Sequence, residues 1–336
     1  MAEALLEVKD LKVCFPTVDG LVKAVDGVSF KLERGQTLGV VGESGSGKSV
    51  SFLTIMGLIN RKNAVVEGEV YFKGRDLLTL AASEMRKIRG DQMGMVFQDP
   101  MTSLHPMYKV GDQIVEAIQA HREMNKRKAM DQAVDMLRKV GIPKPENRAR
   151  QYPHEYSGGM RQRAMIAMAL ALDPDLLIAD EPTTALDVTV QAQILGLIDR
   201  LKKEFNAAVV IVTHDLGVVA EHCGKIQVMY AGRIIERGER DDVYYRARHP
   251  YTWGLLQSIS RLDVKEDRLR PIKGLPPSLI NVPPGCSFHP RCPHRFEKCD
   301  KVDPSLEPHD AEHADACLLP MERKRSVFQE EVAVRA

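Results

Sequence analysis

The first forty residues alternate apolar and charged side chains in short runs, which is typical of strands. Turns are expected at residues 19–20 and 34–35. The apolar run at residues 38–41 predicts a small buried strand, and a glycine-rich loop and an apolar helical stretch over residues 48–59 follow it. Further strands are expected over residues 69–72 and 93–97.

Residues 110–172 carry apolar side chains at helical spacing, and we expect a helical insert over about residues 100–172. Strand and helix alternate again after it, which favours a parallel sheet flanked by helices. Residues 10–30 and 232–238 are expected to add antiparallel strands. The later elements are a strand at 176–179, a helix at 189–203 and a strand at 208–212. The pattern predicts an α/β fold with a mixed central sheet and an antiparallel β subdomain.

The C-terminal quarter has a different composition, with prolines dense between residues 271 and 293. We therefore expect a main domain over residues 1–260 and a proline-rich linker over residues 261–285. A small cysteine-rich module over residues 286–320 follows. The last segment, residues 321–336, is highly charged and is expected to be a frayed tail.

Composition narrows the classes of function. The chain has 336 residues, a net charge of +1 and 5% aromatic residues, so it offers neither the basic surface nor the stacking platform of a nucleic-acid binder. The N-terminus lacks the basic start and apolar core of a signal peptide. The longest apolar run, residues 164–172, is too short to span a bilayer. We expect a soluble chain, which is compatible with its sitting on a membrane protein.

A phosphate-binding loop is predicted where the strand at residues 38–41 ends, because the sequence there matches G-x-x-x-x-G-K-S/T between a strand and a helix. Glycines let successive backbone N–H groups point at phosphate oxygens, and the helix N-terminus adds partial positive charge. Lys48 supplies a full charge and Ser49 a hydroxyl for Mg²⁺. The predicted ATP-binding residues are Gly42, Glu43, Ser44, Gly45, Ser46, Gly47, Lys48 and Ser49.

Two carboxylates, Asp180 and Glu181, follow the apolar strand at residues 176–179. Ligands of open α/β sheets gather at the C-terminal ends of strands. Asp180 is expected to hold Mg²⁺ through water, and Glu181 to polarise the water that attacks the γ-phosphate. The alternative is a solvated strand end without a catalytic role.

Together with these motifs, the segment Ser157-Gly158-Gly159-Met160-Arg161-Gln162-Arg163 resembles the signature motif of the ABC ATPase family, with Met160 where the family has Gln. The resemblance covers most of residues 5–260 and implies a P-loop ATPase core. It also implies roles for residues elsewhere. These are Gln98 as the Q-loop glutamine and Mg²⁺ ligand, Ala185-Leu186-Asp187 as the D-loop, His214 as the switch histidine and Phe15 as the adenine-stacking aromatic.

Some of these assignments leave an alternative. Phe15 is also compatible with a buried strand aromatic, His214 with an ordinary strand-end histidine, and Gln98 with a loop amide. In the family, each ATP lies between the phosphate loop of one subunit and the signature motif of another. The resemblance thus implies that Ser157, Gly158, Gly159 and Asp187 act in trans, and that the chain pairs with itself or with a paralogue.

Within the family, the chain resembles the ATPase subunits of bacterial oligopeptide and dipeptide permeases. The similar segments are residues 97–104, 152–163, 249–252 and 283–293, with His105 where the group has Asn. This implies ATP-driven peptide import at the cytoplasmic face of the membrane, with two membrane-spanning permease subunits and an extracytoplasmic substrate-binding protein. A nickel importer, or a soluble ABC ATPase of translation or DNA repair, are the alternatives.

Four of the six cysteines, Cys286, Cys292, Cys299 and Cys317, follow a C-x5-C-x6-C-x17-C spacing. In a reducing compartment, this cluster favours metal binding over disulfides. A 4Fe–4S cluster is the leading expectation, because similar C-terminal segments of the peptide-permease group hold one, with Zn²⁺ or uncommitted thiols as alternatives. Possible substitute ligands are His289, His294, His309 and His313, while Cys14 and Cys223 are expected to be small core residues.

Overall fold

The computed structural model describes residues 4–184, 186–258, 272–308 and 312–333, and their contacts divide the chain into two compact units. Unit 1 contains residues 33–36 and 79–212, and unit 2 contains residues 4–32, 37–78 and 213–333. The predicted boundary at residue 260 falls at the segment 259–271, which lies outside the described residues. The predicted domain limits therefore stay a prediction.

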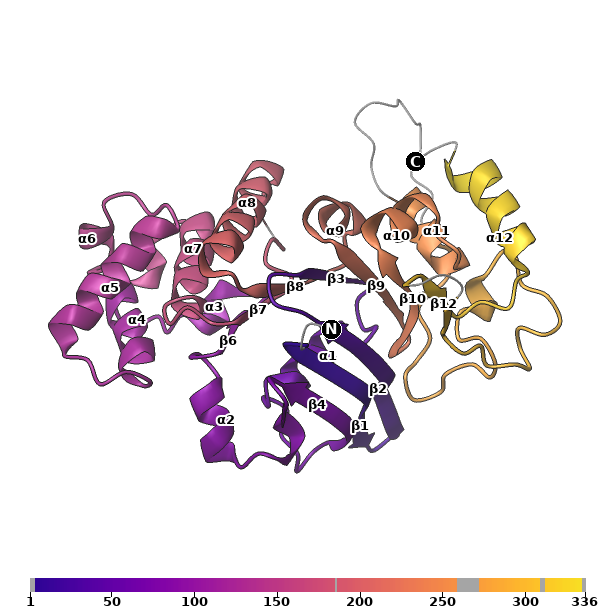
Figure 1. Ribbon diagram of the computed structural model, residues 1–336, viewed down its shortest axis with the longest axis horizontal. Coiled ribbons are helices and arrows are strands. Elements are labelled where there is room, and N and C mark those ends of the chain that lie inside the picture. Colours follow the sequence, from indigo (N-terminus) through magenta and orange to yellow (C-terminus); the bar gives the residue numbers. More distant parts are fainter. Residues whose placement is uncertain (1–3, 185, 259–271, 309–311, 334–336) are drawn as a thin grey trace. The chain divides into compact units, whose positions relative to one another are not determined.

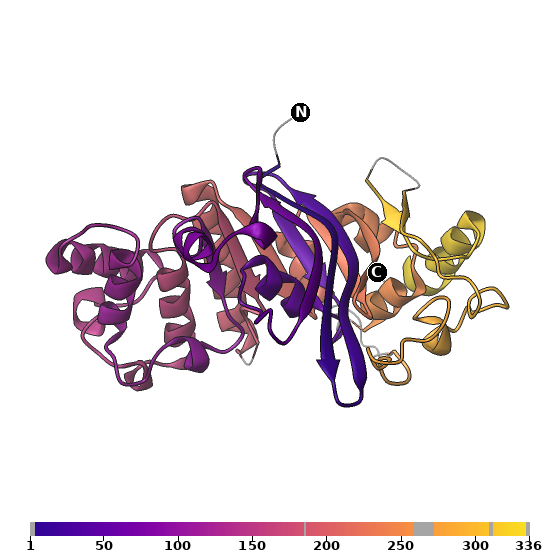
Figure 2. The ribbon, with the colours of Figure 1, turned by 90° about the horizontal axis from the view of Figure 1, so that it is seen from below.

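Unit 2 contains a four-stranded antiparallel sheet in the order β2-β1-β4-β5. The strands are β1 (Leu6–Thr17), β2 (Gly20–Leu32), β4 (Val65–Phe72) and β5 (Arg75–Asp76). Alternate side chains of β1, such as Leu6 and Val8, are buried, which is the period of a sheet with one covered face. β1 and β2 form a long hairpin, the indigo ribbon of Figure 2. Its turn lies at residues 18–19, one residue before the predicted position of 19–20.

A second group of strands in unit 2 is mixed in direction. β3 (Thr37–Val41) runs parallel to β9 (Lys225–Tyr230), and β10 (Arg233–Glu239) runs antiparallel to β9. Two short strands, β12 (Ala314–Asp315) and β11 (Glu307–Pro308), extend it from β10. Every residue of β3 is buried, which accounts for its continuous apolar sequence.

Four helices of unit 2 accompany these strands. They are α1 (Lys48–Ile55), α9 (Leu216–His222), α10 (Arg240–Tyr245) and α11 (Pro250–Gln257). A Cβ on Gly39 would lie 2.7 Å from Val219, so the glycine in β3 permits α9 to pack closely on the strand. A 3-10 turn, Leu77–Thr79, ends this part of the chain.

Unit 1 is built on three parallel strands in the order β8-β7-β6, and β7 is fully buried. Their bounds are β6 (Met93–Val96), β7 (Leu176–Asp180) and β8 (Ala208–Thr213). The expected helical insert is present: α4, α5 and α6 form a bundle that packs against α7 (Figure 1). The helices are α2 (Ala82–Ile88), α3 (Pro100–Ser103), α4 (Val110–Gln119), α5 (Lys126–Lys139), α6 (Pro145–Arg148), α7 (Gly158–Ala169) and α8 (Val188–Phe205), with a 3-10 turn at Pro153–Glu155.

The C-terminal region contains a 3-10 turn (His289–Arg291), helix α12 (Met321–Val327) and a π-helix (Phe328–Ala333). The expectation of a frayed tail is wrong for residues 321–333. Val327, Phe328 and Val332 are buried on one side, and the π-helix packs against α11. The buried Lys324 ammonium pairs with Asp315 at 2.5 Å, so the charge that suggested fraying is neutralised inside the fold.

The fold predicted from the sequence is confirmed in its main features, namely an α/β chain with a mixed sheet, an antiparallel β subdomain and a helical insert. Residues 10–30 belong to β1 and β2 and so build a separate sheet with β4 and β5. Among the described residues, no helix combines the length and the apolar character needed to cross a membrane.

The loop between β3 and α1 is seated tightly on its own unit. A Cβ on Gly42 would lie 2.2 Å from the carbonyl oxygen of Met229, and one on Gly47 would lie 2.2 Å from that of Ala24. Gly47 also has a φ of +98°, and Gly45 has a φ of +79° with no neighbour within 4 Å of its missing Cβ. The loop therefore needs glycine at position 47 for space as well as for backbone conformation.

We predict that Gly47→Ala destabilises the protein by more than about 3 kcal/mol, because steric overlap with Ala24 adds to the backbone strain. The matched control, Gly45→Ala, carries similar strain without a clash and should cost only about 1 kcal/mol. Denaturant unfolding of both variants measures the difference. Equal destabilisation would contradict the tight seating of the loop.

Candidate nucleotide-binding site

The phosphate loop places its lysine at its own centre. Lys48 is the first residue of α1 and only 4% exposed. Its ammonium donates to the carbonyl oxygens of Gly42 at 2.6 Å and Glu43 at 2.9 Å, and it lies 3.5 Å from the Ser46 hydroxyl. Together with the N–H groups at the start of α1, this charge makes the loop fit for an anion.

Backbone contacts hold the loop against neighbouring strands of unit 2. The Gly232 N–H, just after β9, donates to the carbonyl oxygen of Ser46 at 3.0 Å. Ser44 and Gly45 at the tip are exposed, whereas Gly47 is buried and Ser49 is half-buried. The loop thus has a fixed base and an open tip, which suits a site that takes up phosphate groups from solvent.

Two further predicted residues lie in unit 2. Phe15 is on β1 opposite Val22 and is half-buried. It is therefore not one of the fully buried strand aromatics, and its ring keeps an accessible surface. His214 follows β8 and is exposed, while the next residue, Asp215, caps α9 by accepting from Gly217 N–H at 2.8 Å.

In unit 1, Gln98 and Glu181 come together. The Gln98 Nε2 donates to Glu181 Oε2 at 3.0 Å, and the Thr184 hydroxyl donates to the same oxygen at 2.8 Å. Sequence reasoning missed Thr184, because nothing in its own type or spacing distinguishes it from a turn residue. The two donors fix the orientation of the carboxylate.

The backbone at Glu181 is strained. Its φ is +46°, in the left-handed region that non-glycine residues rarely adopt, and its N–H donates to the Val212 carbonyl oxygen at 2.8 Å. The preceding Asp180, the last residue of β7, is 6% exposed. Such strain is found at functional sites, where the surrounding structure holds a side chain in a required direction.

The segment that resembles the signature motif opens α7, a 12-residue helix. Ser157 is its N-cap and accepts from the Met160 N–H at 3.3 Å, and the serine is exposed. Gly158 has no neighbour within 4 Å of a Cβ position, whereas a Cβ on Gly159 would lie 3.0 Å from Val190. The start of α7 therefore offers backbone N–H groups at an accessible surface.

A buried amide links this helix to the segment that follows Asp180 and Glu181. Gln162 is 2% exposed and donates to the Pro182 carbonyl oxygen at 2.6 Å, one residue after Glu181. The sequence pattern included Gln162 but assigned it no such role. Asp187 is exposed and caps α8 by accepting from the Val190 N–H at 2.9 Å, and Ala185 of the D-loop lies outside the described residues.

The prediction of an iron–sulfur cluster is wrong. Among the described residues, no group of three or more His, Cys, Asp or Glu side chains is arranged to hold a metal ion, which also removes the zinc alternative. Cys286 meets Cys299 through the backbone, its N–H donating to the carbonyl oxygen at 2.8 Å. Burial raises the pKa of Cys292 and Cys317 to about 12, so both thiols are neutral at pH 7.

The proposed substitute ligands are engaged elsewhere. His313 Nε2 lies 2.9 Å from Glu236, His294 packs edge-on against Trp253, and the His289 ring lies 2.9 Å from the Cys286 carbonyl oxygen. His309 lies outside the described residues. Cys223 is buried as expected, and Cys14 is half-buried on β1.

Aromatic side chains pack the module against the rest of unit 2. The Phe288 ring lies 5.3 Å from Tyr230 and 5.4 Å from Tyr251, between centroids. Phe288 thus joins a segment too small to bury a core of its own to aromatic side chains of β9 and α11.

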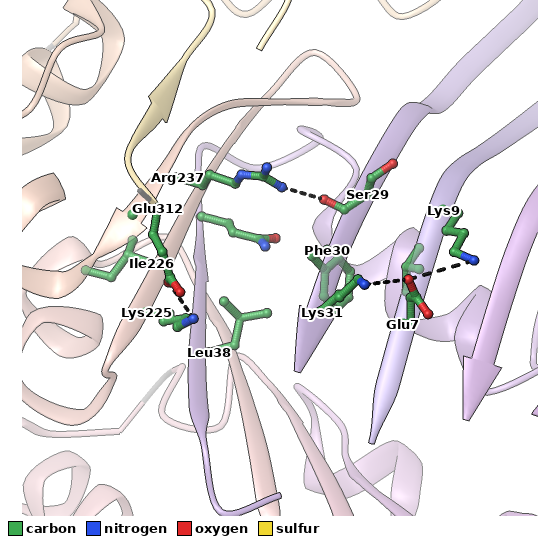
Figure 3. A pocket seen from close by; sticks show the side chains of 13 residues that line it. Glu7, Lys9, Ser29, Phe30, Lys31, Leu38, Lys225, Ile226, Arg237 and Glu312 are labelled. Atoms are coloured by element: carbon green, nitrogen blue, oxygen red, sulfur yellow. Dashed lines mark hydrogen bonds and ion pairs between the residues drawn. The ribbon is translucent and has the colours of Figure 1, made fainter. Parts of the chain in front are cut away.

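A surface cavity of about 350 Å³ in unit 2 lies apart from these residues (Figure 3). It opens between β1 and β2 on one side and β9 and β10 on the other. Its cations are paired, with Lys31 at 2.9 Å from Glu7 and Lys225 at 2.5 Å from Glu312. None of its lining residues belongs to the predicted ATP-binding set.

Comparison with known proteins places the chain. A family model described as "ABC transporter" matches residues 25–184, and one described as "Oligopeptide/dipeptide transporter, C-terminal region" matches residues 235–299. The chain is 51% identical over 321 residues to the oligopeptide transport ATP-binding protein OppD of Escherichia coli, covering 96% of this chain and 95% of that protein. It is 51% identical over 322 residues to the dipeptide transport ATP-binding protein DppD of Bacillus subtilis, covering 96% of each.

A solved structure shares the fold of most of the chain. It is the ATP-binding cassette MJ0796, a dimer in a post-hydrolysis state bound to ADP and Pi. The match has a TM-score of 0.63 and 28% sequence identity, and covers 70% of this chain and 98% of that one. The predicted P-loop ATPase fold is thereby confirmed, and the chain belongs to the ABC transporter family of ATP-hydrolysing, ATP-binding proteins.

Proposed function

We propose that this chain hydrolyses ATP to power a membrane importer of oligopeptides or dipeptides. The observation that carries this is the identity of half of its residues, over 96% of its length, to peptide transport ATP-binding proteins. The match of residues 235–299 to the oligopeptide/dipeptide transporter C-terminal region supports it independently of the ATPase core.

In this proposal, the loop of residues 42–49 binds the phosphates of ATP, and Phe15 stacks on adenine. The central Lys48 ammonium and the close seating of Gly42 and Gly47 support the first role, and the half-buried ring of Phe15 the second. Ser49, Gln98 and Asp180 are oxygen donors of the kind that Mg²⁺ prefers. The ion would neutralise charge on the phosphates.

Glu181 is the proposed general base, and Gln98 and Thr184 orient it. Both donate to the same carboxylate oxygen, which holds the side chain in one direction. A carboxylate so held can accept a proton from the attacking water. His214 completes the catalytic set as the residue that matches the family's switch histidine, and its exposure leaves it accessible.

The chain is proposed to act as half of a pair, with a second copy or with a paralogue. Ser157, Gly158, Gly159 and Asp187 would contact nucleotide bound to the partner, a role supported by the exposed N-terminus of α7. The remaining proposed partners are two membrane-spanning permease subunits, at the cytoplasmic face of the membrane, and an extracytoplasmic substrate-binding protein.

Glu181→Gln keeps the size of the side chain and one oxygen that can accept from Gln98 and Thr184, but it removes the base. We predict unchanged ATP binding and a loss of turnover of about 10²–10⁴-fold. Phosphate release by the assembled transporter, beside a nucleotide titration, measures both. Retention of most of the ATPase activity would contradict the assignment of Glu181.

Because Glu181→Gln is expected to bind ATP without hydrolysing it, this variant also tests whether two chains associate. With ATP it should elute at twice the chain mass if the chain pairs with itself, and adding Ser157→Arg should return it to the monomer. A paralogue partner would instead be required before the dimer forms. Loss of ATP binding by the isolated Ser157→Arg chain would contradict action in trans.

Cargo is tested by uptake into cells whose own gene for this chain is deleted. One strain is complemented with the wild-type chain and the other with Glu181→Gln. We predict that labelled tri- and tetrapeptides enter only with the wild-type copy, whereas nickel uptake is the same in both strains. Nickel uptake that depends on Glu181 while peptide uptake does not would overturn the peptide assignment.

A further inference from the structure

The C-terminal region reaches the phosphate loop through one arginine side chain. Arg291, at the end of the 3-10 turn, binds the carboxylate of Glu43, the second residue of the loop. Its Nη1 donates to Oε2 at 2.6 Å and its Nη2 donates to Oε1 at 2.9 Å. A guanidinium that engages both oxygens of a carboxylate fixes its partner in one geometry.

Other segments of unit 2 hold the rest of this guanidinium. Its Nε donates to the Lys273 carbonyl oxygen at 3.0 Å, and Nη2 donates to that of Gly274 at 3.2 Å. Nη1 lies 3.4 Å from the hydroxyl of Tyr230, the last residue of β9. The Arg291 side chain is 5% exposed, so the ion pair is shielded from water on its arginine side.

A second contact, from α11, reaches the backbone of the same loop residue. The Glu43 N–H donates to the Tyr251 hydroxyl at 2.7 Å. The Tyr251 ring is fully buried, 4.6 Å from Tyr230 and 5.4 Å from Phe288 between centroids. Burial raises the pKa of Tyr251, so its hydroxyl stays neutral. Side chains from the C-terminal third of the chain thus fix both the side chain and the backbone of Glu43.

The charge of Glu43 requires such a partner. A carboxylate within a loop that receives the phosphates of ATP repels them unless it is neutralised. The Lys48 ammonium donates to the carbonyl oxygen of Glu43 at 2.9 Å. Arg291 supplies the compensating charge from outside the loop.

We propose that Arg291 is a positioning residue for the phosphate loop. By binding Glu43, it couples the C-terminal region to the affinity for ATP, whereas the chemistry of hydrolysis stays with other residues. This inference rests on the proposed role of residues 42–49 in binding ATP.

The test is a double-mutant cycle on the full chain, made with Arg291→Met, Glu43→Gln and the pair of substitutions together. A fluorescent ATP analogue with Mg²⁺ is titrated into each variant. Arg291→Met should weaken binding about tenfold, because it leaves a carboxylate uncompensated in the loop. Adding Glu43→Gln should restore the affinity to within about threefold of the wild-type value, because the repelling charge is gone.

The assembled transporter gives a second readout. Arg291→Met should raise the KM for ATP about tenfold and leave kcat at saturating ATP unchanged, as expected when uniform binding is lost. The matched control is Arg295→Met, an exposed arginine of the same module, which should match the wild type in both measurements. A purely structural role of Arg291 would lower kcat with the folded fraction and would not be relieved by Glu43→Gln.

Arg291→Lys keeps the positive charge but cannot donate to both oxygens of the Glu43 carboxylate as the guanidinium does. It therefore tests the proposal even if the methionine variant does not fold. It should bind ATP several-fold more weakly than the wild type. Wild-type affinity in Arg291→Lys and Arg291→Met, or in the lysine variant when the methionine variant is unfolded, would overturn the proposal. Lys48→Ala separates failure of this proposal from failure of the proposed ATP-binding role of residues 42–49. If Lys48→Ala retains ATP affinity, the assignment of the loop fails, whatever the result for Arg291.

Discussion

The structure depends on bringing backbone amides close enough to bind a polyanion. The loop after β3 achieves this by lying directly on its neighbours, where carbonyl oxygens of Met229 and Ala24 leave no room for a Cβ on Gly42 or Gly47. That close approach fixes where α1 begins, and hence where Lys48 sits at the centre of the loop. The apolar strand β3 can be buried on both faces because the groups proposed to bind phosphate follow its C-terminal end.

The same constraint explains the C-terminal region. A loop that curls around a lysine carries an acidic residue, Glu43, and its charge and its N–H both need partners. Arg291 and Tyr251 provide them, and both stand on an aromatic cluster with Phe288. The region is therefore packed against unit 2 through this aromatic cluster. ATP binding and C-terminal packing become parts of one structure in unit 2.

Much of this could be predicted from local patterns. The phosphate loop, the acidic strand end and the capped start of α7 are continuous segments, and their chemistry is legible from residue type and order. The contacts of Arg291 with Glu43 and of Thr184 with Glu181 were not predictable, because neither periodicity nor motif spacing reports which distant side chains meet. The cysteine spacing gave the wrong expectation of a metal centre for the same reason. Among the described residues, proximity in sequence does not bring three ligands around one point. Charge alone likewise suggested a frayed tail, although buried Val327 and the Lys324–Asp315 pair anchor it.

The central claim is that the phosphate loop and the C-terminal region respond to ATP together. Hydrogen–deuterium exchange of the full chain, with and without MgATP, tests it most directly, because a ligand that stabilises the loop must also stabilise the segment that holds it. The account predicts slower exchange in the peptides covering residues 42–49 and 286–292 of the wild type, and only in residues 42–49 of Arg291→Met. Protection of residues 42–49 with no change at residues 286–292 in the wild type would contradict it.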